Sequence, residues 1–188
     1  MNPEQALADF LKSVEKRAFK RTAFNVRDEE SALDIVQDAM IRLAERYADR
    51  PAEEWPMLFQ RILSNATMDW FRRQKVRNAF FTSLEDLETT DEDAGFDFLE
   101  YLQTDAASSG TESAADGAYR TEVMGIIESE VAALPNRQRE AFLLRYWEDL
   151  DVAETAQAMG CSEGSVKTHC SRAVHALAQA LKARGIAL

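Results

Sequence analysis

The strongest chemical signal in the sequence is a set of hydroxyl and basic side chains near the C-terminus. Apolar residues of 163–182 recur with a helical period, which predicts an inner stripe of Val166, Cys170, Ala173, Val174, Leu177 and Leu181. The same period turns another set outward: Ser165, Lys167, Thr168, Ser171, Arg172 and His175. Short hydroxyls and a lysine can bond base edges, and an arginine can hold phosphate, so this face suits DNA. An ordinary amphipathic helix with a solvated face would show the same spacing.

A second polar stripe lies closer to the N-terminus. Five polar residues fall on neighbouring turns of one predicted helix: Arg61, Asn65, Asp69, Arg72 and Arg73. Between residues 61 and 77 there are five basic residues and one acidic residue, and Trp70 and Phe71 lie among them. This mixture of cations and aromatic rings suits a phosphate chain with unpaired bases. A solvated face above an aromatic core would explain it equally well.

The remaining candidates for site chemistry are possible metal ligands: Cys161, His169, Cys170 and His175. His169 and Cys170 are adjacent and point in different directions on a helix, and the spacing of the four matches no common zinc pattern. The sequence also has no P-loop, dinucleotide-binding glycine turn, nucleophile elbow or His-Glu-x-x-His helix. We therefore expect no metal, no cofactor and no enzymatic activity, and we interpret the two cysteines as reduced thiols.

Helices are needed to position these side chains, and the composition favours an all-α protein. Among the 188 residues only seven glycines and four prolines interrupt abundant helix formers, and no clear run alternates apolar and polar residues. In the N-terminal part, helices are expected from Pro3, from about Asp28, and from Pro56 to about Lys75. The second of these should bury an inner stripe of Leu33, Val36, Met40, Leu43 and Tyr47.

The C-terminal part of the sequence predicts four further helices. The first begins near Ala118 and is closed by Pro135, and Asn136 can cap the next. A short helix over 152–159 and a longer one over 163–182 follow, with Gly160 in the turn between them and Ser162 as a cap. Two helices joined by a short glycine-containing turn have the helix-turn-helix form.

The net charge of −11 is confined to the middle of the chain. Residues 79–117 carry eleven acidic and no basic side chains, whereas 1–78 and 118–188 are each within one charge of neutrality. We interpret 79–117 as an acidic flexible linker between two small helical domains, at 1–78 and 118–188. Its apolar residues are unusual for a simple tether and indicate a partner for part of it: Phe80, Phe81, Phe96, Phe98, Leu99 and Tyr101.

The order of these features resembles the extracytoplasmic-function subfamily of bacterial sigma-70 factors. Residues 28–45, DEESALDIVQDAMIRLAE, resemble that family's core-binding helix. Residues 55–73, WPMLFQRILSNATMDWFRR, resemble its promoter-melting helix, and 134–177 resemble its helix-turn-helix for the minus-35 element. The resemblance covers both predicted domains in the family's order.

This resemblance implies an alternative sigma factor with a region 2 helical bundle and a region 4 helix-turn-helix, whose partners are core RNA polymerase, promoter DNA and an anti-sigma factor. Polymerase would be contacted by Asp34, Ile35, Val36, Gln37 and Asp38. Minus-10 DNA would be contacted by Arg61, Asn65, Asp69, Trp70, Arg72 and Arg73. Minus-35 DNA would be contacted by Ser165, Lys167, Thr168, Ser171 and Arg172. The acidic linker would thread towards the RNA exit path of the polymerase.

A stand-alone helix-turn-helix transcriptional regulator is the main alternative. Such a protein would use the C-terminal domain for DNA and the N-terminal domain for dimerisation or ligand sensing. The first domain discriminates between the two, because a regulator has no need of a DIVQD helix beside a basic, aromatic-bearing helix. The sequence shows neither a signal peptide nor an apolar stretch long enough to cross a bilayer, so we expect a cytoplasmic protein.

Overall fold

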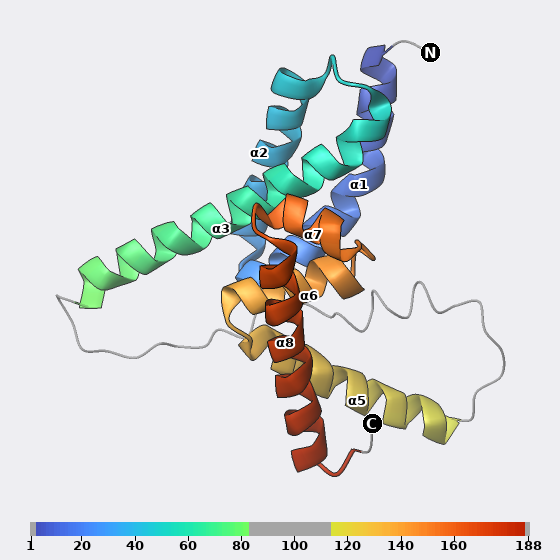
Figure 1. Cartoon of the computed structure of the whole chain (residues 1–188), viewed down its shortest axis with the longest axis vertical. Coiled ribbons are helices and arrows are strands. Elements are labelled where there is room, and N and C mark those ends of the chain that lie inside the picture. The colour runs from blue at the N-terminus through green and yellow to red at the C-terminus, as the bar shows by residue number, and fades with distance from the viewer. Residues whose placement is uncertain (1–2, 83–113, 187–188) are drawn as a thin grey trace.

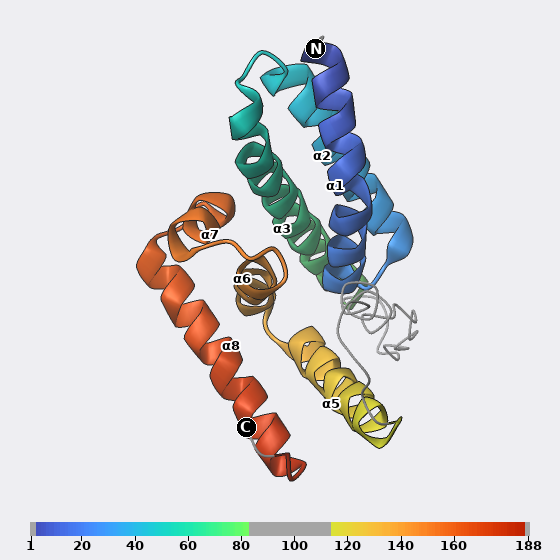
Figure 2. The same ribbon diagram turned by 90° about the vertical axis from the view of Figure 1, so that its right-hand side faces the viewer.

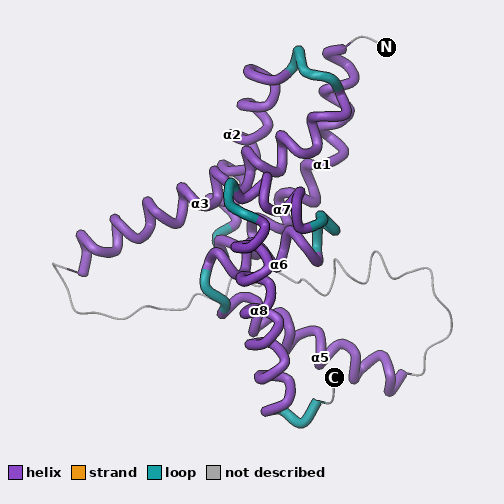
Figure 3. The backbone as a smooth tube through the Cα atoms, in the orientation of Figure 1, coloured by secondary structure: helices purple, strands orange, loops and turns teal. Residues whose placement is uncertain are grey.

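The computed structural model describes residues 3–82 and 114–186, and within these ranges it consists of helices and loops without a β-strand (Figures 1 and 3). The prediction of an all-α protein is therefore confirmed. A 3-10 helix, η1 (Ala52–Glu54), precedes α3, and the α-helices are α1 (Pro3–Val26), α2 (Glu29–Tyr47), α3 (Trp55–Thr82), α5 (Ala114–Ala133), α6 (Asn136–Tyr146), α7 (Val152–Met159) and α8 (Glu163–Ala183). In the described part of the chain, no helix is long and apolar enough to span a membrane.

Helices α1, α2 and α3 pack side by side around one apolar core (Figure 2). Its most deeply buried members come from α2 and α3: Ala32, Val36, Ala39, Leu43, Phe59 and Leu63. The ring of Phe10 packs against Trp55 and Phe59 with centroid separations of 6.0 and 6.2 Å. Full burial of a large apolar side chain contributes about 1.5–3 kcal/mol. This core fixes α3 along one side and leaves another side for its polar stripe.

Helices α5 to α8 enclose two smaller cores that share α6 and α8. One core includes Val131, Leu134, Leu143, Ala173 and Leu177. The other joins α6 and α8 to α7 through Ala141, Leu144, Ala156, Met159 and Val166. Because α8 contributes the same apolar side to both cores, its opposite side is left to solvent along its length.

Each of two predicted inner stripes has one member that is exposed in the structure, while the other members are buried or half-buried. Leu33 and Val174 were expected to face inward, but each is 44% exposed. In α2 the core is filled instead by the alanines at 32 and 39 and by Ile35. Small side chains allow helices to approach closely, so a stripe traced through the largest apolar residues of α2 includes the exposed Leu33 and omits the alanines that lie in the core.

Several helix ends also differ from those predicted. Helix α3 continues to Thr82 rather than ending near Lys75, and α5 begins at Ala114 rather than near Ala118. Both helices thus extend into the range 79–117 that the sequence assigns to the linker. The remainder of that linker, including its Phe96–Tyr101 stretch and its predicted path, lies outside the described residues, and the domain division stays a prediction.

The predicted cap of α6 was wrong. Pro135, not Asn136, occupies the N-cap position, with φ −54° and ψ 142°, and no side chain caps this helix. The proline ring already fixes the backbone turn that precedes the helix. Asn136 uses its Oδ1 atom to accept a hydrogen bond from Nη2 of Arg139 at 3.0 Å.

The two parts of the chain also contact each other, which no local pattern in the sequence indicates. Helices α1 and α3 lie against α6 and α7 (Figure 2). Phe24 of α1 is buried in a core of the C-terminal part, where its ring lies 6.2 Å from that of Trp147. Met57 of α3 packs against the other C-terminal core. The chain therefore adopts a closed arrangement.

Candidate nucleic-acid interface

Local hydrogen bonds fix the helix-turn-helix of α7 and α8. A capping box begins α7: Asp151 Oδ1 accepts from the Glu154 N–H, and Glu154 Oε2 accepts from the Asp151 N–H, both at 2.8 Å. Gly160 ends α7 with φ 62°, in the left-handed region that glycine adopts without strain. The predicted cap of α8 is confirmed, because Ser162 Oγ accepts from the Ser165 N–H at 3.1 Å. These contacts fix the end of α7 and the start of α8.

The first turns of α8 carry a polar, cationic face. Ser165 is half-buried, and the other four residues predicted to face minus-35 DNA are exposed: Lys167, Thr168, Ser171 and Arg172. Within residues 3–82 and 114–186, neither Lys167 nor Arg172 forms an ion pair or hydrogen bond. The N–H groups at a helix N-terminus add a partial positive charge. This face can therefore hold phosphate and present donors to base edges.

Arg137 and His169 border this face, and neither was predicted to belong to it. Arg137 comes from α6, and its Nη1 donates to the Met159 carbonyl at the end of α7 at 3.3 Å. His169 is half-buried, and its Nδ1 has no partner among the described residues. Burial lowers the pKa of His169, and nearby Arg137 and Arg172 lower it further. The periodicity of α8 could not reveal Arg137, because only the fold brings another helix to this position.

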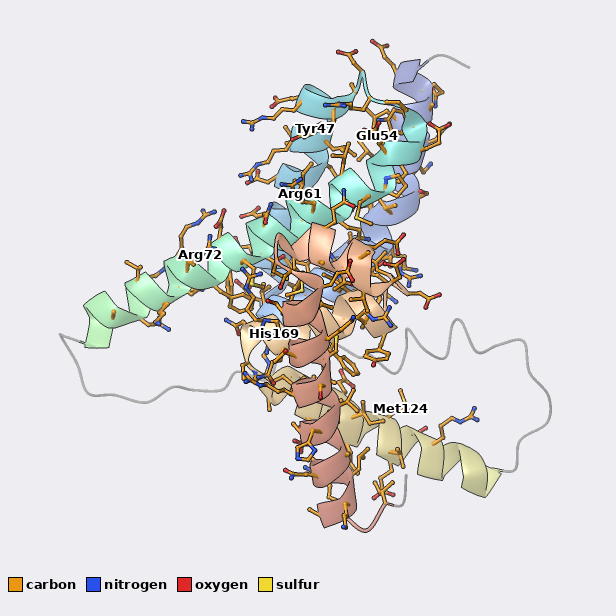
Figure 4. All side chains as sticks on the ribbon, in the orientation of Figure 1. Tyr47, Glu54, Arg61, Arg72, Met124 and His169 are labelled. Carbon is orange, nitrogen blue, oxygen red and sulfur yellow. The ribbon has the colours of Figure 1, made fainter. Side chains whose placement is uncertain are left out.

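The polar stripe of α3 lies beside the first core. Of the six residues predicted to face minus-10 DNA, Asp69 and Trp70 are half-buried and the others are exposed: Arg61, Asn65, Arg72 and Arg73. Figure 4 shows Arg61 and Arg72 well separated along the helix. Arg72 pairs with Asp69 one turn away at 2.5 Å, but an exposed pair of this kind contributes only about 0–1 kcal/mol. Arg72 can therefore exchange this partner for phosphate at little cost.

Two aromatic rings accompany these cations. Trp70 packs against the first core and meets Phe71 edge to face, with centroids 5.1 Å apart. The guanidinium of Arg139, from α6, lies 5.4 Å from the centroid of the Phe71 ring. In the closed arrangement Arg139, which belongs to the C-terminal part, thus lies over the Phe71 ring of this stripe.

Helix α2 presents an acidic surface with apolar members. Asp34, Gln37 and Asp38 are exposed, as predicted for a polymerase-contacting surface, whereas Ile35 and Val36 are 7% and 1% exposed and belong to the first core. Those two side chains support the helix and do not face a partner. Leu33 and Ile41 are 44% and 53% exposed and flank the acidic residues. The sequence analysis placed Leu33 in the core, and therefore missed this apolar part of the surface.

The cysteines are both free and half-buried. Burial raises the pKa of the Cys170 thiol, although Arg145 opposes the shift, and Cys170 Sγ lies 3.8 Å from the Ala141 carbonyl oxygen. Among the described residues, no group of three or more histidine, cysteine or acidic side chains is arranged to hold a metal ion.

The buried polar residues between the two parts of the chain form a further group that sequence reasoning did not identify: Arg21, Asn25, Arg139, Glu140 and Glu148. Each lies on or beside a helix. Sequence patterns ordinarily place the polar residues of such a helix on its solvent-exposed side. A buried charge needs a partner, and here the partner comes from more than a hundred residues away, as between Asn25 and Glu140. No local pattern in the sequence could indicate these pairings.

Comparison with known proteins finds similarity to RNA polymerase sigma factors. The family model "Sigma-70, region 4" matches residues 124–177. RNA polymerase sigma-E factor of Streptomyces avermitilis is 28% identical over 164 residues, which cover 86% of this chain and 76% of that protein. RNA polymerase sigma factor SigV of Bacillus subtilis is 28% identical over 162 residues, covering 85% and 81%.

A solved structure also shares the fold. It is the sigma factor RpoE in complex with the anti-sigma factor NepR from Bartonella quintana, with a TM-score of 0.58 over 95% of this chain and 96% of that one. The two sequences are 18% identical, so this similarity shows the fold alone.

Proposed function

Because this chain belongs to the extracytoplasmic-function subfamily of the sigma-70 family, we propose that it binds core RNA polymerase and directs it to promoters with minus-35 and minus-10 elements. The similarity to curated sigma factors carries the proposal, because it extends over 86% of the chain and must include most of the N-terminal part. A stand-alone regulator would share only the helix-turn-helix. The exposed residues of α2 and the polar stripe of α3 would then have no binding partner.

The exposed face of α8 is proposed to read the minus-35 element. Lys167 and Thr168 lie near the capped N-terminus, where side chains of a recognition helix contact base edges in the major groove. Arg172 is one turn further along and is suited to phosphate. Support comes from their exposure and from the absence of competing partners for both cations in the described part of the chain.

The stripe of α3 is proposed to contact the minus-10 element and the strand that separates there. Arg72 and Arg73 are exposed cations beside Trp70 and Phe71, and ring faces of this kind can stack on unpaired bases. Asn65 is exposed two turns earlier and can donate to a base or phosphate. Strand separation of this kind uses binding energy alone, so the chain is proposed to work without a catalytic site or a cofactor.

The exposed side of α2 is proposed to dock on the polymerase. Asp34 and Asp38 supply negative charge, Gln37 lies between them, and Leu33 and Ile41 supply apolar area at the flanks. An interface that combines charged residues with apolar area gives both orientation and affinity. We further propose a cytoplasmic location, where polymerase and promoters are found, and control by an anti-sigma factor, because the Bartonella sigma factor was solved in complex with one.

Run-off transcription with purified core polymerase and a genomic promoter pool tests the proposal. A sigma factor must bind core polymerase and yield discrete start sites that require both the chain and the core enzyme. A stand-alone regulator would retain specific duplex binding without the polymerase and would yield no start site of its own. That second result, or a complete lack of core binding, would overturn the proposed function.

A further inference from the structure

A pair of basic side chains from two different helices lies beside the exposed face of α8. Helices α6 and α8 meet where Cys170 Sγ lies 3.8 Å from the Ala141 carbonyl oxygen. Arg137 precedes Ala141 by one turn of α6, and His169 is the neighbour of Cys170 on α8. Arg137 is also close enough to lower the pKa of His169. The meeting of the two helices therefore brings these side chains together.

The guanidinium of Arg137 is held in place but is not neutralised. Its Nη1 donates to the Met159 carbonyl at the end of α7 at 3.3 Å. This is its one hydrogen bond among the described residues, and it pairs with no carboxylate there. A guanidinium has five N–H donors in a fixed plane, so several remain for an acceptor outside the chain. The bond to α7 orients these donors.

The imidazole of His169 presents one N–H to solvent. Burial, and then Arg137 and Arg172, lower its pKa, so the ring is neutral at neutral pH and carries a single N–H. Nδ1 is buried and has no partner among the described residues, whereas Nε2 is not buried. Because buried N–H groups are almost always paired, the proton belongs on Nε2. His169 thus offers an uncharged donor next to a charged one.

The positive charge around this pair has no carboxylate to balance it. Both charged groups that shift the pKa of His169 are arginines. The carboxylate of Glu140 in α6 accepts a hydrogen bond from α1, and that of Glu154 caps the far end of α7. Glu163 is the first residue of α8, about two turns before His169. Cations that lie close together repel each other, and a bound anion offsets this repulsion. The site therefore suits an anion with oxygen acceptors.

A phosphate of the DNA backbone is the anion that fits this place. The pair borders the α8 face that is proposed to lie in the major groove, and phosphate chains form the edges of that groove. When one helix enters the groove, neighbouring helices of the same domain come against the backbone. Arginine and other N–H donors bind the phosphate oxygens there. Arg137 lies on such a neighbouring helix.

We propose that Arg137 and His169 form a site for one backbone phosphate of the minus-35 duplex, in which Arg137 supplies the charge and His169 Nε2 supplies an uncharged N–H. The inference rests on the proposed function, which places duplex DNA on the adjoining face of α8. It adds α6 to the helices that contact DNA. A phosphate contact of this kind fixes the position of the recognition helix, while contacts to base edges supply the sequence preference.

The salt dependence of duplex binding by the full-length chain separates the two contacts. Arg137→Ala should weaken binding and reduce the slope of log affinity against log salt by about 0.9, because one phosphate contact by a cation is lost. Arg137→Lys keeps the charge and should keep the slope. His169→Ala should weaken binding about tenfold without changing the slope, because it removes a neutral donor to a charged acceptor.

Two further variants serve as controls for this measurement. His169→Gln carries an amide that can donate from a similar position, so it should restore most of the affinity that His169→Ala loses. Lys182→Ala removes an exposed lysine at the other end of α8 and should leave both the affinity and the slope unchanged.

Duplexes that carry a single uncharged methylphosphonate locate the phosphate. At one backbone position this change should weaken binding of the wild type but have little effect on Arg137→Ala, because that variant has already lost the contact. The same position should show a reduced effect in His169→Ala. If Arg137 only stabilises the end of α7, the methylphosphonate effects will be equal in wild type and variant at every position, and that result would overturn the site.

The remaining outcomes are also decisive. An unchanged salt slope in Arg137→Ala would overturn the charged contact, and a slope that falls in His169→Ala as much as in Arg137→Ala would overturn the neutral donor. Circular dichroism checks the helix content of each variant. If Arg137→Ala loses helix content, Arg137→Gln takes its place, because a glutamine can still donate to the Met159 carbonyl but carries no charge.

Failure of the site can be told apart from failure of the proposed function. The salt slope and the methylphosphonate series need only duplex DNA, whereas the proposed function requires start sites with core polymerase. Methylphosphonate coupling without start sites would retain the phosphate site and overturn the sigma function. Start sites without coupling would do the reverse. A wild-type chain that binds no duplex, either alone or with core polymerase, would overturn both.

Discussion

Helices α3 and α8 both present polar residues opposite an apolar core, but they arrange them differently. On α8 the exposed residues from Lys167 to Arg172 span only about 7.5 Å near a capped N-terminus. On α3 the residues from Arg61 to Arg73 extend over about 18 Å, and two aromatic rings lie among them. A short, donor-rich end suits the major groove of a duplex, whereas a long stripe with rings suits an unpaired strand. The difference indicates a division of labour between the two helices.

The largest expected effect is on the free energy of unfolding, and it comes from a substitution in the core that supports α3. Leu63 is fully buried in the first core, so Leu63→Ala should lower the free energy of unfolding by about 2–5 kcal/mol. Urea unfolding followed by circular dichroism measures the change. Val76→Ala on the same helix is the control, because Val76 is 57% exposed and its truncation should change stability by less than about 0.5 kcal/mol. Equal effects of the two substitutions would show that α3 is not held by this core.

The next effect concerns only the duplex-binding face. Lys167→Ala should weaken binding to minus-35 duplex by about 1–3 kcal/mol and relax the preference at one base position. Fluorescence anisotropy with specific and scrambled duplexes measures both. Lys182→Ala removes an exposed lysine at the other end of α8 and should leave the sequence preference unchanged. If the two lysine variants behave alike, the N-terminal turns of α8 do not read the bases.

A smaller effect comes from the cap that positions this face. Ser162→Ala removes the acceptor of the Ser165 N–H and should cost about 1 kcal/mol of stability. Ser171→Ala, at an exposed position in the middle of the helix, should cost less than about 0.5 kcal/mol. Thermal unfolding compares the two. A larger loss for Ser171→Ala would contradict the proposed importance of the cap.

The smallest expected effect is a pH dependence at His169. Its pKa in the folded chain is lowered by burial and by Arg137 and Arg172, so the unfolded chain binds this proton more tightly. The His169 contribution to stability is therefore complete above the unfolded pKa of about 6.5, and declines as the pH falls through that value towards the lower folded pKa. His169→Gln should reduce this slope of stability against pH. An unchanged slope in His169→Gln would contradict the assignment.

The sequence predicted those features that depend on neighbours within one helix. The helical class, the cap at Ser162 and the outward position of Lys167 all follow from local spacing, and the structure agrees with them. Positions that depend on packing were predicted less well. Leu33 is exposed because alanines fill the core beneath α2, and Arg137 reaches the α8 face from another helix. The partners of Asn25 lie more than a hundred residues away, beyond any periodic signal.

The central claim is that α3 acts on separated DNA while α2 binds the polymerase, and two paired variants test it most directly. Core binding and strand separation are measured side by side, the latter by the fluorescence of 2-aminopurine in the minus-10 element. Arg72→Ala with Arg73→Ala should retain core binding, lose strand separation and reduce the salt slope of single-strand binding by about 1.4. Asp34→Ala with Gln37→Ala should lose core binding. The same defect from both pairs would contradict this division of roles.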